Sequence, residues 1–599
     1  MTPLAGLVVL DLGAGTAGSV ARLLFADAGA RVLAVPVDPP GAWDRGTQFV
    51  AMDDAGVRES LLANADVVIA GSMNAVDLAE ARRRHPRLVT GLVTAYGSEG
   101  PLADRATDPE SLVVARYGLA TAQAGRLPGP VHLRIPFVTV NAAVLLVAGV
   151  LAAVLRRDGT GQGGHVETSL LSGLLATTTE SFVDGPGIDI TARLETFLSR
   201  RAAGVLPFYG AYECADGRWL HLGCSYPHFA VRAASALGIG DVAAALVSGP
   251  GWDDGRIPSP AVRDALYPVI EGLMRRRPAA EWAAVLEAAD VPFAPVHSPA
   301  EVLDDPQVRA NGVLTTLGQD GRTVEAAGPA IRFREGDVGI DAPRRTGEGV
   351  GLLAGLRVLE LGNLIAAPLA GRLLADLGAE VIKLEPPDGG DLARRADVPA
   401  FHPLNAGKRG IAADLKSPTG RELAEALVRS VDVVVANMRP GALERLGMGP
   451  QRLLEVNPGL VVATVSAFGA TGPYAPRPGV DGLAAAIAGG QLIQAGGDGR
   501  PVQLTGAPHD HTTGLLAAAG ILMALVGRAR SGRGRIVETS LLDAALLMVA
   551  PHLVRVDGQA PPADGVLGRA RQYGSTRWER LFETADGWLA IAACTPRER

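Results

Sequence analysis

The sequence predicts an α/β fold that occurs twice along the chain, and two observations carry this prediction. First, LAGLVVLDLGAGTAGSVARLLFADAGARVLAV from Leu4 and LAGLRVLELGNLIAAPLAGRLLADLGAEVIKL from Leu353 have the same pattern. Each contains an apolar strand, a glycine-containing turn, an Ala/Leu-rich helix and a β-branched strand, which is typical of a parallel βαβ unit. Second, later segments recur in the same order: ADVVIA and VDVVVA, GQGGHVETSLL and GRGRIVETSLL, ADGRWLHLGC and ADGWLAIAAC.

Length and composition indicate a multidomain globular protein. A chain of 599 residues with 48% hydrophobic and 20% charged residues is too long for a single core. The 56 Lys and Arg residues are outnumbered by 63 Asp and Glu residues, so no basic surface for nucleic acid is expected. Cys214, Cys224 and Cys594 have neither paired nor metal-ligand spacing. This usage and an N-terminus without a basic signal region favour a cytoplasmic protein.

One segment, Pro136–Leu155, is apolar enough to be considered as a membrane span. It contains Thr139 and Asn141, and a second copy of the segment recurs later in a similar setting. We therefore expect a buried helix and no membrane partner.

The two copies meet near residue 350, where FREGDVGIDAPRRTGEG is polar enough to be a linker. We predict a first domain over residues 1–345 and a second over residues 346–599. After the Trp219 motif the first copy continues for well over a hundred residues, whereas the second stops just after Cys594. By this measure we expect the second domain to lack a C-terminal part of roughly 120 residues.

The first turn contains a G-x-G-x-x-G motif, Gly13–Gly18, with Asp38 about twenty residues beyond it. Taken alone, this motif is typical of a dinucleotide or S-adenosylmethionine site. In the second copy the three glycines correspond to Gly362, Leu364 and Ala367. Because only the first glycine recurs, we favour tight packing of strand against helix over a nucleotide site.

The two copies differ most clearly at Asp510. Counting back from VETSLL in each copy places Asp510 opposite Thr139, His509 opposite Val138, Gly514 opposite Ala143 and Asp481 opposite Glu110. A buried carboxylate costs several kcal/mol unless it is compensated. A helix N-terminus stabilises the anion, so Asp510 is either an N-cap residue or a nucleophile. His509 and His511 are too close for an i, i+4 zinc pair, and no metal site is expected.

Basic residues in two loops are also specific to the second copy. They are Lys408, Arg409, Lys416, Arg439 and Arg445, in NAGKRGIAADLKSPTG and NMRPGALERLG. Each of them alone is more typical of a solvated surface charge. Their combined absence from the first copy, together with that of Asp510, indicates a site for an anionic ligand.

The motifs LELGNLIAAPLAGRLLADLGAEVIKLEPPDGGD, NAGKRGIAADLKSPTG, NMRPGALERLGMG, VSAFGATGPYAPRPGVDG, GAPHDHTTG and GRGRIVETSLLDAAL follow in order over nearly all of the second copy. This copy resembles the family III CoA-transferases, the group of formyl-CoA transferase, carnitine CoA-transferase and α-methylacyl-CoA racemase. The first copy matches in framework only. The resemblance implies a Rossmann-like parallel sheet in a large domain, a smaller second domain, and two interlocked copies, here as a pseudo-dimer within one chain or as a homo-dimer.

The resemblance also implies site residues. Asp510 matches the aspartate that forms an acyl anhydride and an aspartyl-CoA thioester, and Asp481 matches an acidic active-site position. Asn363, Leu364, Ile365 and Ala366 match the turn that lines the CoA site. The nucleotide end of CoA is expected near Lys416, Asn437, Met438 and Arg445. The implied function is an acyl-CoA:carboxylate CoA-transferase, with acyl-CoA and a carboxylic acid as substrates and no permanently bound cofactor.

Two alternatives stay open. One is an α-methylacyl-CoA racemase, although Val480 stands where the racemases carry a histidine that shares proton transfer, which favours transfer. The other is a non-catalytic CoA-binding subunit. Ile365 replaces a glutamine of formyl-CoA transferase, which speaks against a formyl/oxalate substrate pair. The tandem arrangement is similar to the dimethylsulfoniopropionate CoA-transferase/lyase, whose second domain is the catalytic one.

Overall fold

The structure is a computed structural model, and its description covers residues 2–36, 41–52, 54–71, 77–179, 202, 204–241, 260–319, 321–339, 350–394, 401–495, 499–559, 572–574 and 576–593. The predicted domain boundary between residues 345 and 346 lies outside the described residues. Asp38 and Cys594 also lie outside them.

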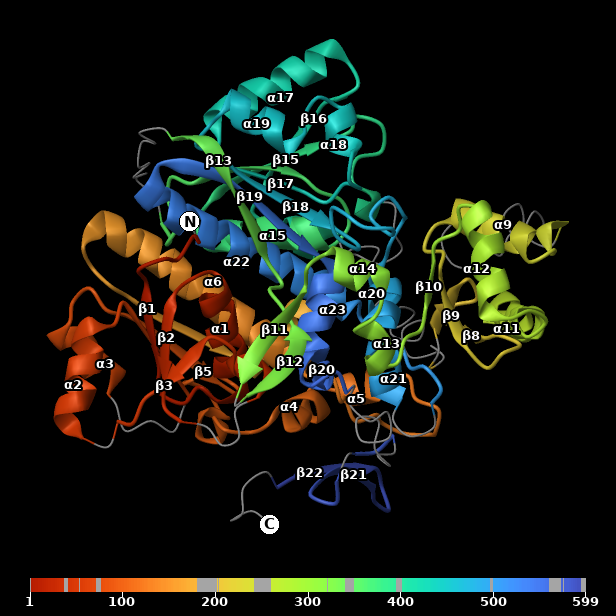
Figure 1. The fold of residues 1–599 in the computed structure, drawn as a ribbon, viewed down its shortest axis with the longest axis horizontal. Helices are drawn as coiled ribbons and strands as arrows, with labels where there is room; N and C mark the ends of the chain where they lie inside the picture. The colour runs from red at the N-terminus through yellow and green to blue at the C-terminus, as the bar shows by residue number, and fades with distance from the viewer. Residues whose placement is uncertain are drawn as a thin grey trace.

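The first half of the chain forms a six-stranded parallel sheet (Figure 1). Its order is β3-β2-β1-β4-β5-β6, which is the order of a Rossmann sheet. The strands are β1 (Val8–Asp11), β2 (Arg31–Ala34), β3 (Thr47–Phe49), β4 (Val67–Gly71), β5 (Val89–Thr94) and β6 (His165–Ser169).

The second half repeats this topology. Six parallel strands lie in the corresponding order, β16-β15-β14-β17-β18-β19, and the predicted duplicated α/β fold is confirmed. They are β14 (Arg357–Leu361), β15 (Glu380–Glu385), β16 (Arg409–Ala412), β17 (Val433–Ala436), β18 (Val461–Ser466) and β19 (Arg533–Ser540). The inner strands are continuously apolar, as in β17, because helices cover both faces of a parallel sheet.

Two long helices pack against each other between the sheets, α6 (Phe137–Thr160) and α22 (Pro508–Ser531). Each has 24 residues, and 89% of the most apolar window of each is buried inside the protein. Asn141 and Thr512 occupy the same position in the two halves, and the Thr512 hydroxyl donates to Asn141 Oδ1 at 2.5 Å. Such a contact between equivalent positions is the signature of a twofold arrangement. The segment considered as a membrane span is thus a core helix.

The later part of the first half lies against the second half. A small antiparallel sheet, β10-β9-β8-β7, packs through β9 and β10 on helix α20 (Asp481–Ile487). Strand β13 (Arg332–Gly339) joins the second sheet antiparallel to β19, so the stretch predicted as a linker begins as a strand. The small sheet and its helices are β7 (Gly204–Leu206), β8 (Tyr209–Glu213), β9 (Trp219–Gly223), β10 (Phe293–Pro295), α9 (Pro227–Ala236), α11 (Pro260–Met274) and α12 (Ala279–Ala288).

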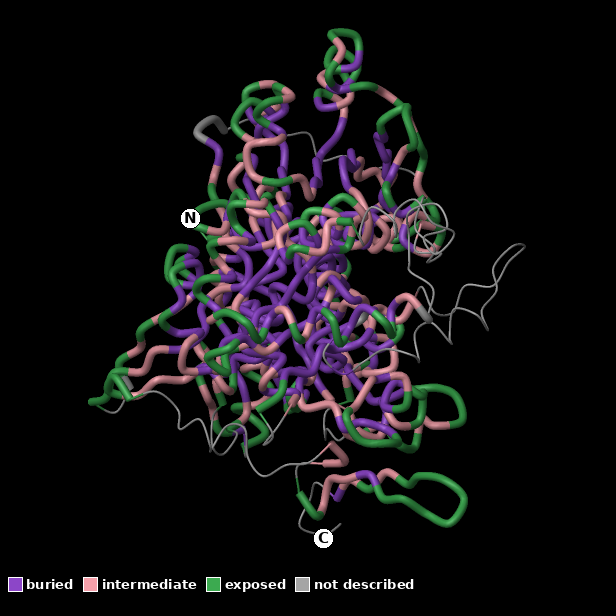
Figure 2. Tube along the Cα trace, turned by 90° about the vertical axis from the view of Figure 1, so that its right-hand side faces the viewer, coloured by how far each residue is buried: buried purple, intermediate pink, exposed green. Residues whose placement is uncertain are grey.

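The second half makes reciprocal contacts with the first. Strand β20 (Val554–Val556) pairs with β12 (Arg322–Ala327), and the hairpin of β21 (Glu579–Glu583) and β22 (Trp588–Ala592) contacts α4 (Glu110–Arg116). Buried residues concentrate in the middle of the molecule, whereas this terminal hairpin is largely exposed or half-buried (Figure 2). Whether the two halves are interlocked stays a prediction.

Candidate active site

In both halves an acidic side chain caps the N-terminus of the long central helix. Glu110 accepts hydrogen bonds from the backbone N–H groups of Val138 and Thr139 at 3.2 and 2.8 Å. Asp481 accepts from the N–H groups of His509 and Asp510 at 2.8 and 3.3 Å. The structure therefore confirms the alignment of the two halves at this point, and Asp510 takes the place of Thr139.

The electrostatic setting of the two capping acids differs. Burial raises the pKa of Glu110 to about 7. Burial also acts on Asp481, which is only 2% exposed, but the charge and hydrogen bonds of His509 outweigh it and hold the pKa of Asp481 below its ordinary value. His509 Nδ1 lies 3.1 Å from Asp481 Oδ2. Asp481 thus supports the start of α22 as an anion.

Asp510 is the third residue of α22 and is half-buried. The N-cap residue is Ala507, which has φ +49° and whose side chain makes no capping hydrogen bond. The alternative that Asp510 is an N-cap is therefore wrong, since Asp481 performs this task from another helix. A carboxylate in the first turn also profits from the positive end of the helix dipole.

The predicted CoA turn follows β14 and enters α15 (Ala366–Asp376). Asn363 and Asn437 lie side by side: the Asn363 N–H donates to Asn437 Oδ1 at 2.9 Å, and Asn437 Nδ2 donates to the Asn363 carbonyl at 2.7 Å. Leu364 has φ +63°, a strained conformation for a non-glycine residue. Its N–H donates to Asp391 Oδ1 at 2.9 Å. The side chains of Asn437 and Asp391 therefore fix the turn.

A buried cluster of charged side chains supports the turn. Lys383 Nζ lies 2.7 Å from Glu360, 2.8 Å from Asp391 and 2.8 Å from the Gly362 carbonyl. Lys408 Nζ pairs with Glu360 at 2.7 Å, and burial lowers the pKa of Lys408 to about 8. The interpretation of Lys408 as a surface charge is wrong, because its side chain is only 2% exposed. The local sequence around Lys408 could not reveal this pairing, because Glu360 lies on another strand, β14.

Helix α22 approaches the turn closely at Gly514. A Cβ atom at this glycine would lie 2.5 Å from the Ala366 carbonyl oxygen and 3.0 Å from Leu369 Cβ. Only a glycine allows this approach, since Cβ atoms do not come within 3.0 Å of a backbone oxygen. The contact places the first turns of α22 and α15 together, and with them Asp510 and the predicted CoA turn.

The other predicted CoA residues lie in segments that follow the carboxyl ends of β16 and β17. Lys416 follows β16 and is exposed, and Arg445 is exposed on α18 (Ala442–Arg445). Met438 is half-buried two residues after β17. The carboxyl edge of a parallel sheet is where such folds bind ligands. Lys416, Met438 and Arg445 each follow the carboxyl end of a strand of the second sheet, as the turn at residues 363–366 does.

The glycine motif of the first half serves packing. Asp11 accepts hydrogen bonds from the Gly13 and Ala14 N–H groups, each at 2.9 Å, and pairs with buried Arg22. A Cβ at Gly18 would lie 2.8 Å from the Asp11 carboxylate. The turn amides thus already hold a carboxylate of the chain, which agrees with the interpretation against a nucleotide site.

A sequence model of CoA-transferase family III matches residues 51–347 and 353–598. The chain belongs to CoA-transferase family III. The match in both halves agrees with the repeat in the sequence and in the sheet order.

Three relatives show the range of similarity. The succinate–glutarate CoA-transferase of Agrobacterium fabrum is 36% identical over 255 residues, which are 40% of this chain and 62% of that protein. The CoA-transferase/lyase DddD of a Marinomonas species is 26% identical and covers 98% of this chain and 80% of its own length. The crystal structure of Rv3272 from Mycobacterium tuberculosis has 35% identity, a TM-score of 0.37, and covers 42% of this chain and 66% of that one. The chain spans 60–66% of the length of several curated relatives.

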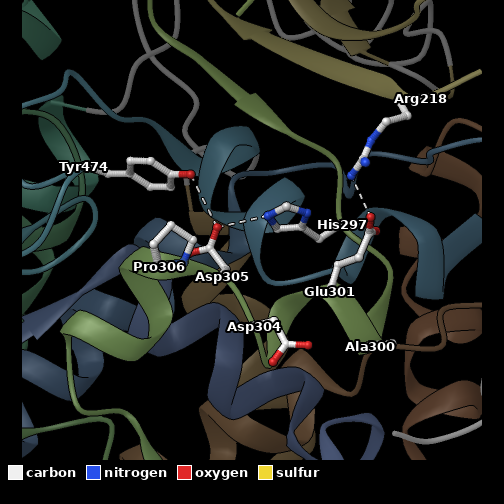
Figure 3. A pocket seen from close by; sticks show the side chains of 8 residues that line it. All are labelled: Arg218, His297, Ala300, Glu301, Asp304, Asp305, Pro306 and Tyr474. Atoms are coloured by element: carbon white, nitrogen blue, oxygen red, sulfur yellow. Dashed lines mark hydrogen bonds and ion pairs between the residues drawn. The ribbon is translucent and has the colours of Figure 1, made fainter. Parts of the chain in front are cut away.

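A cavity of about 380 Å³ is lined by eight described residues, and none of these eight is a predicted site residue (Figure 3). Its lining joins His297 and Asp305 of the first half to Tyr474 of the second half, and His297 Nε2 lies 3.0 Å from Asp305 Oδ2. Asp305 also caps α14 (Pro306–Ala310), so these contacts have a structural role at the junction of the halves.

The two histidines beside Asp510 have protein partners. His511 Nδ1 donates to the Ala507 carbonyl at 2.9 Å, and His509 contacts Asp481. Within the described part of the chain, no group of three or more His, Cys, Asp or Glu side chains is placed to hold a metal ion.

Proposed function

We propose that the protein is an acyl-CoA:carboxylate CoA-transferase and that Asp510 is its nucleophile. The observation that carries this proposal is the matched pair of helix starts, in which both halves keep the capping acid but only the second places a carboxylate at the third helix position. Membership in CoA-transferase family III and relatives named as CoA-transferases support it.

The chemistry requires a carboxylate. Asp510 attacks the thioester carbonyl of acyl-CoA, the C–S bond breaks, and its electron pair leaves with the CoA thiolate, which yields a mixed anhydride. The thiolate then attacks the aspartyl carbonyl, releases the donor acid and leaves an aspartyl-CoA thioester. The acceptor carboxylate attacks this thioester, and the thiolate finally attacks the acceptor's carbonyl. Acceptor-CoA leaves, Asp510 is restored, and no water is consumed.

The turn at residues 363–366 is proposed to line the CoA site. Asn437 and Asp391 hold this turn through its backbone, so it keeps one conformation before CoA binds. Lys416 and Arg445, with Met438 between them in the sequence, would meet the anionic nucleotide end of CoA. Asp481 acts on Asp510 by positioning its helix turn.

The first half is proposed to be non-catalytic, since Thr139 has no carboxylate to form an anhydride. Its later strands join or cover the second half, which supports an interlocked pseudo-dimer within one chain. A cytoplasmic location fits a CoA-dependent reaction and the unpaired, buried Cys214 and Cys224.

Exchange of CoA between an acyl-CoA and a carboxylic acid tests the proposal with two matched variants. Asp510→Asn keeps the side-chain shape but removes the nucleophile, and it should abolish exchange. Thr139→Ala changes the equivalent residue of the first half and should leave the rate unchanged. Full exchange by Asp510→Asn would refute the proposal.

The same samples distinguish the racemase alternative. Uptake of deuterium from heavy water at the α-carbon of a 2-methylacyl-CoA, without any acceptor acid, would favour an isomerase. Binding of acyl-CoA with neither exchange nor deuterium uptake would favour a non-catalytic CoA-binding subunit.

A further inference from the structure

The N-terminus of helix α20, where Asp481 stands, is capped by the first half of the chain. Its N-cap residue, Val480, makes no side-chain hydrogen bond. The first N–H groups of a helix have no partner within the helix, so they need acceptors from elsewhere. The Tyr209 hydroxyl on β8 is such an acceptor, since it accepts from the Gly482 N–H at 3.1 Å. A side chain of the small sheet thus caps the helix that begins with Asp481.

Two further side chains hold this cap in place. The His221 ring on β9 meets the Tyr209 ring edge to face, with centroids 5.5 Å apart. Gln491 of α21 (Gly490–Ala495) donates through Nε2 to the Gly482 carbonyl at 3.0 Å, and the same nitrogen lies 2.9 Å from His221 Nδ1. His221 and Gln491 are buried. The Tyr209 hydroxyl and the first turn of α20 therefore share one buried set of contacts.

A glycine after Asp481 makes this close approach possible. A Cβ atom at Gly482 would lie 2.5 Å from His221 Nε2 and 3.2 Å from Tyr209 Cε1. A larger residue would therefore displace the His221 ring from the helix start. In the alignment of the two halves, the first half has Ser111 at this position. The small residue is thus specific to the half that carries Asp510.

The equivalent contact in the other half is built from different residues. The hairpins β8–β9 and β21–β22 pair in the same register around matching A-D-G turns, and β22 contacts α4 as β9 contacts α20. In this register Glu579 stands in the place of Tyr209, and Ala590 in the place of His221. The tyrosine and the histidine, like Asp510, therefore occur at one of the two equivalent helix starts.

Only two hydrogen bonds and one peptide link join Tyr209 to the backbone of Asp510. The Tyr209 hydroxyl accepts from the Gly482 N–H, and the carboxylate of the preceding residue, Asp481, accepts from the Asp510 N–H at 3.3 Å. Asp481 and Gly482 are consecutive residues in one helix turn, so they move together. A shift in the first turn of α20 is therefore passed on to the first turn of α22.

We propose that Tyr209 of the first half is a positioning residue for the attack of Asp510 on acyl-CoA. By capping α20 it sets the place of Asp481, and Asp481 sets the place of Asp510. This inference rests on the proposed function of Asp510. Tyr209 takes part in no bond that forms or breaks, and it acts on the rate because the attacking carboxylate must be aligned with the thioester carbonyl. The half without a nucleophile thus contributes to the rate of the reaction.

The experiment uses the full chain and the variant Tyr209→Phe, which keeps the ring and removes the acceptor of the Gly482 N–H. Tyr212→Phe is the matched control. Tyr212 lies on the same strand but three residues further, hence on the opposite face, and its hydroxyl donates to the Pro207 carbonyl. Each variant loses one hydrogen-bonded hydroxyl, so their melting temperatures should agree within about 3 °C.

Single-turnover labelling of Asp510 and steady-state kcat and KM are measured for each protein. The acyl-CoA is whichever of acetyl-, succinyl- and hexanoyl-CoA labels Asp510 fastest in the wild type. The labelling rates are also measured with Asp481→Ala present, because a residue that acts through Asp481 loses its effect when that carboxylate is absent.

We expect Tyr209→Phe to lower the labelling rate and kcat by about 10-fold with little change in KM, since loss of one cap moves the helix by less than the displacement of about 1 Å that costs roughly 100-fold. Tyr212→Phe should leave both rates unchanged. With Asp481→Ala present, Tyr209→Phe should change the labelling rate by less than about 2-fold.

An unchanged labelling rate in Tyr209→Phe, in a protein where Asp510→Asn abolishes labelling, overturns this inference and leaves the proposed function intact. Equal losses in Tyr209→Phe and Tyr212→Phe also overturn it, because they indicate a general loosening of the small sheet. So does a 10-fold loss that persists with Asp481→Ala present, which would show that Tyr209 does not act through Asp481. Full exchange in Asp510→Asn refutes the proposed function itself, and the inference with it.

Discussion

Replacing the two capping acids by alanine separates their structural role from catalysis. Asp481→Ala removes an acceptor from two backbone N–H groups and from His509 Nδ1. Glu110→Ala removes an acceptor from the two equivalent N–H groups of the first half. Each substitution therefore removes the cap from the N-terminus of a long central helix, α22 or α6. Only α22 carries the proposed nucleophile.

The stability costs follow from the contacts. A hydrogen bond to a charged acceptor contributes about 1.5–3 kcal/mol, and loss of a helix cap costs about 0.5–2 kcal/mol. Asp481 is ionised and almost fully buried, so we expect its loss to cost about 3–4 kcal/mol. Glu110 is partly protonated near pH 7, so we expect its loss to cost about 2 kcal/mol.

The effect on catalysis should differ much more than the effect on stability. Without Asp481 the first turn of α22 relaxes and Asp510 moves with it, and a displacement of about 1 Å costs roughly 100-fold in rate. Glu110→Ala should leave kcat/KM of the folded protein unchanged. Urea unfolding measures the stability costs, and CoA exchange measures the rates. Equal losses of activity in both variants, or none in Asp481→Ala, would refute this account of Asp481.

Three further predictions concern other contacts. Gly514→Ala should destabilise the protein by about 1–3 kcal/mol and raise KM for acyl-CoA, because the added Cβ would lie 2.5 Å from the Ala366 carbonyl oxygen. The control Ala143→Gly should leave KM unchanged, and an unaltered KM in Gly514→Ala would contradict the prediction. The raised pKa of Glu110 means that the folded state holds a proton that the unfolded state loses. Stability should therefore fall between pH 4.5 and 7 by about 3 kcal/mol relative to Glu110→Gln, and parallel pH profiles in urea unfolding would contradict this. Burial lowers the pKa of His221 to about 4, so acidification from pH 6.5 to 4 should destabilise the wild type by about 3 kcal/mol more than it destabilises His221→Asn. Equal acid sensitivity of the two proteins would contradict the prediction that His221 is a buried, neutral imidazole at the junction of the halves.

The repeat made much of the fold predictable from the sequence. Apolar strands such as Val433–Ala436 and the alignment of Asp481 with Glu110 needed only local patterns and a comparison of the two halves, and the structure confirms both. Local patterns carry no information on which half a strand joins. The pairing of β13 with the second sheet was therefore missed, and a polar segment with several charges was interpreted as a linker.

The sequence supplied the residues proposed for the site, but it did not reveal the contacts that support them. The spacing of Asp391 and Lys408 gave no sign that both reach one buried cluster, because their partners lie on other strands. A signal for Asp391 did exist: an acidic residue closes the EPPDGGD loop at the carboxyl end of a parallel strand.

Mass spectrometry of the full chain incubated with acyl-CoA tests the central claim most directly. The account predicts a covalent acyl or CoA adduct on the peptide that contains Asp510, released by hydroxylamine, and no adduct on the peptide that contains Thr139. Rapid CoA exchange without any adduct on Asp510, or an adduct that persists in Asp510→Asn, would contradict it.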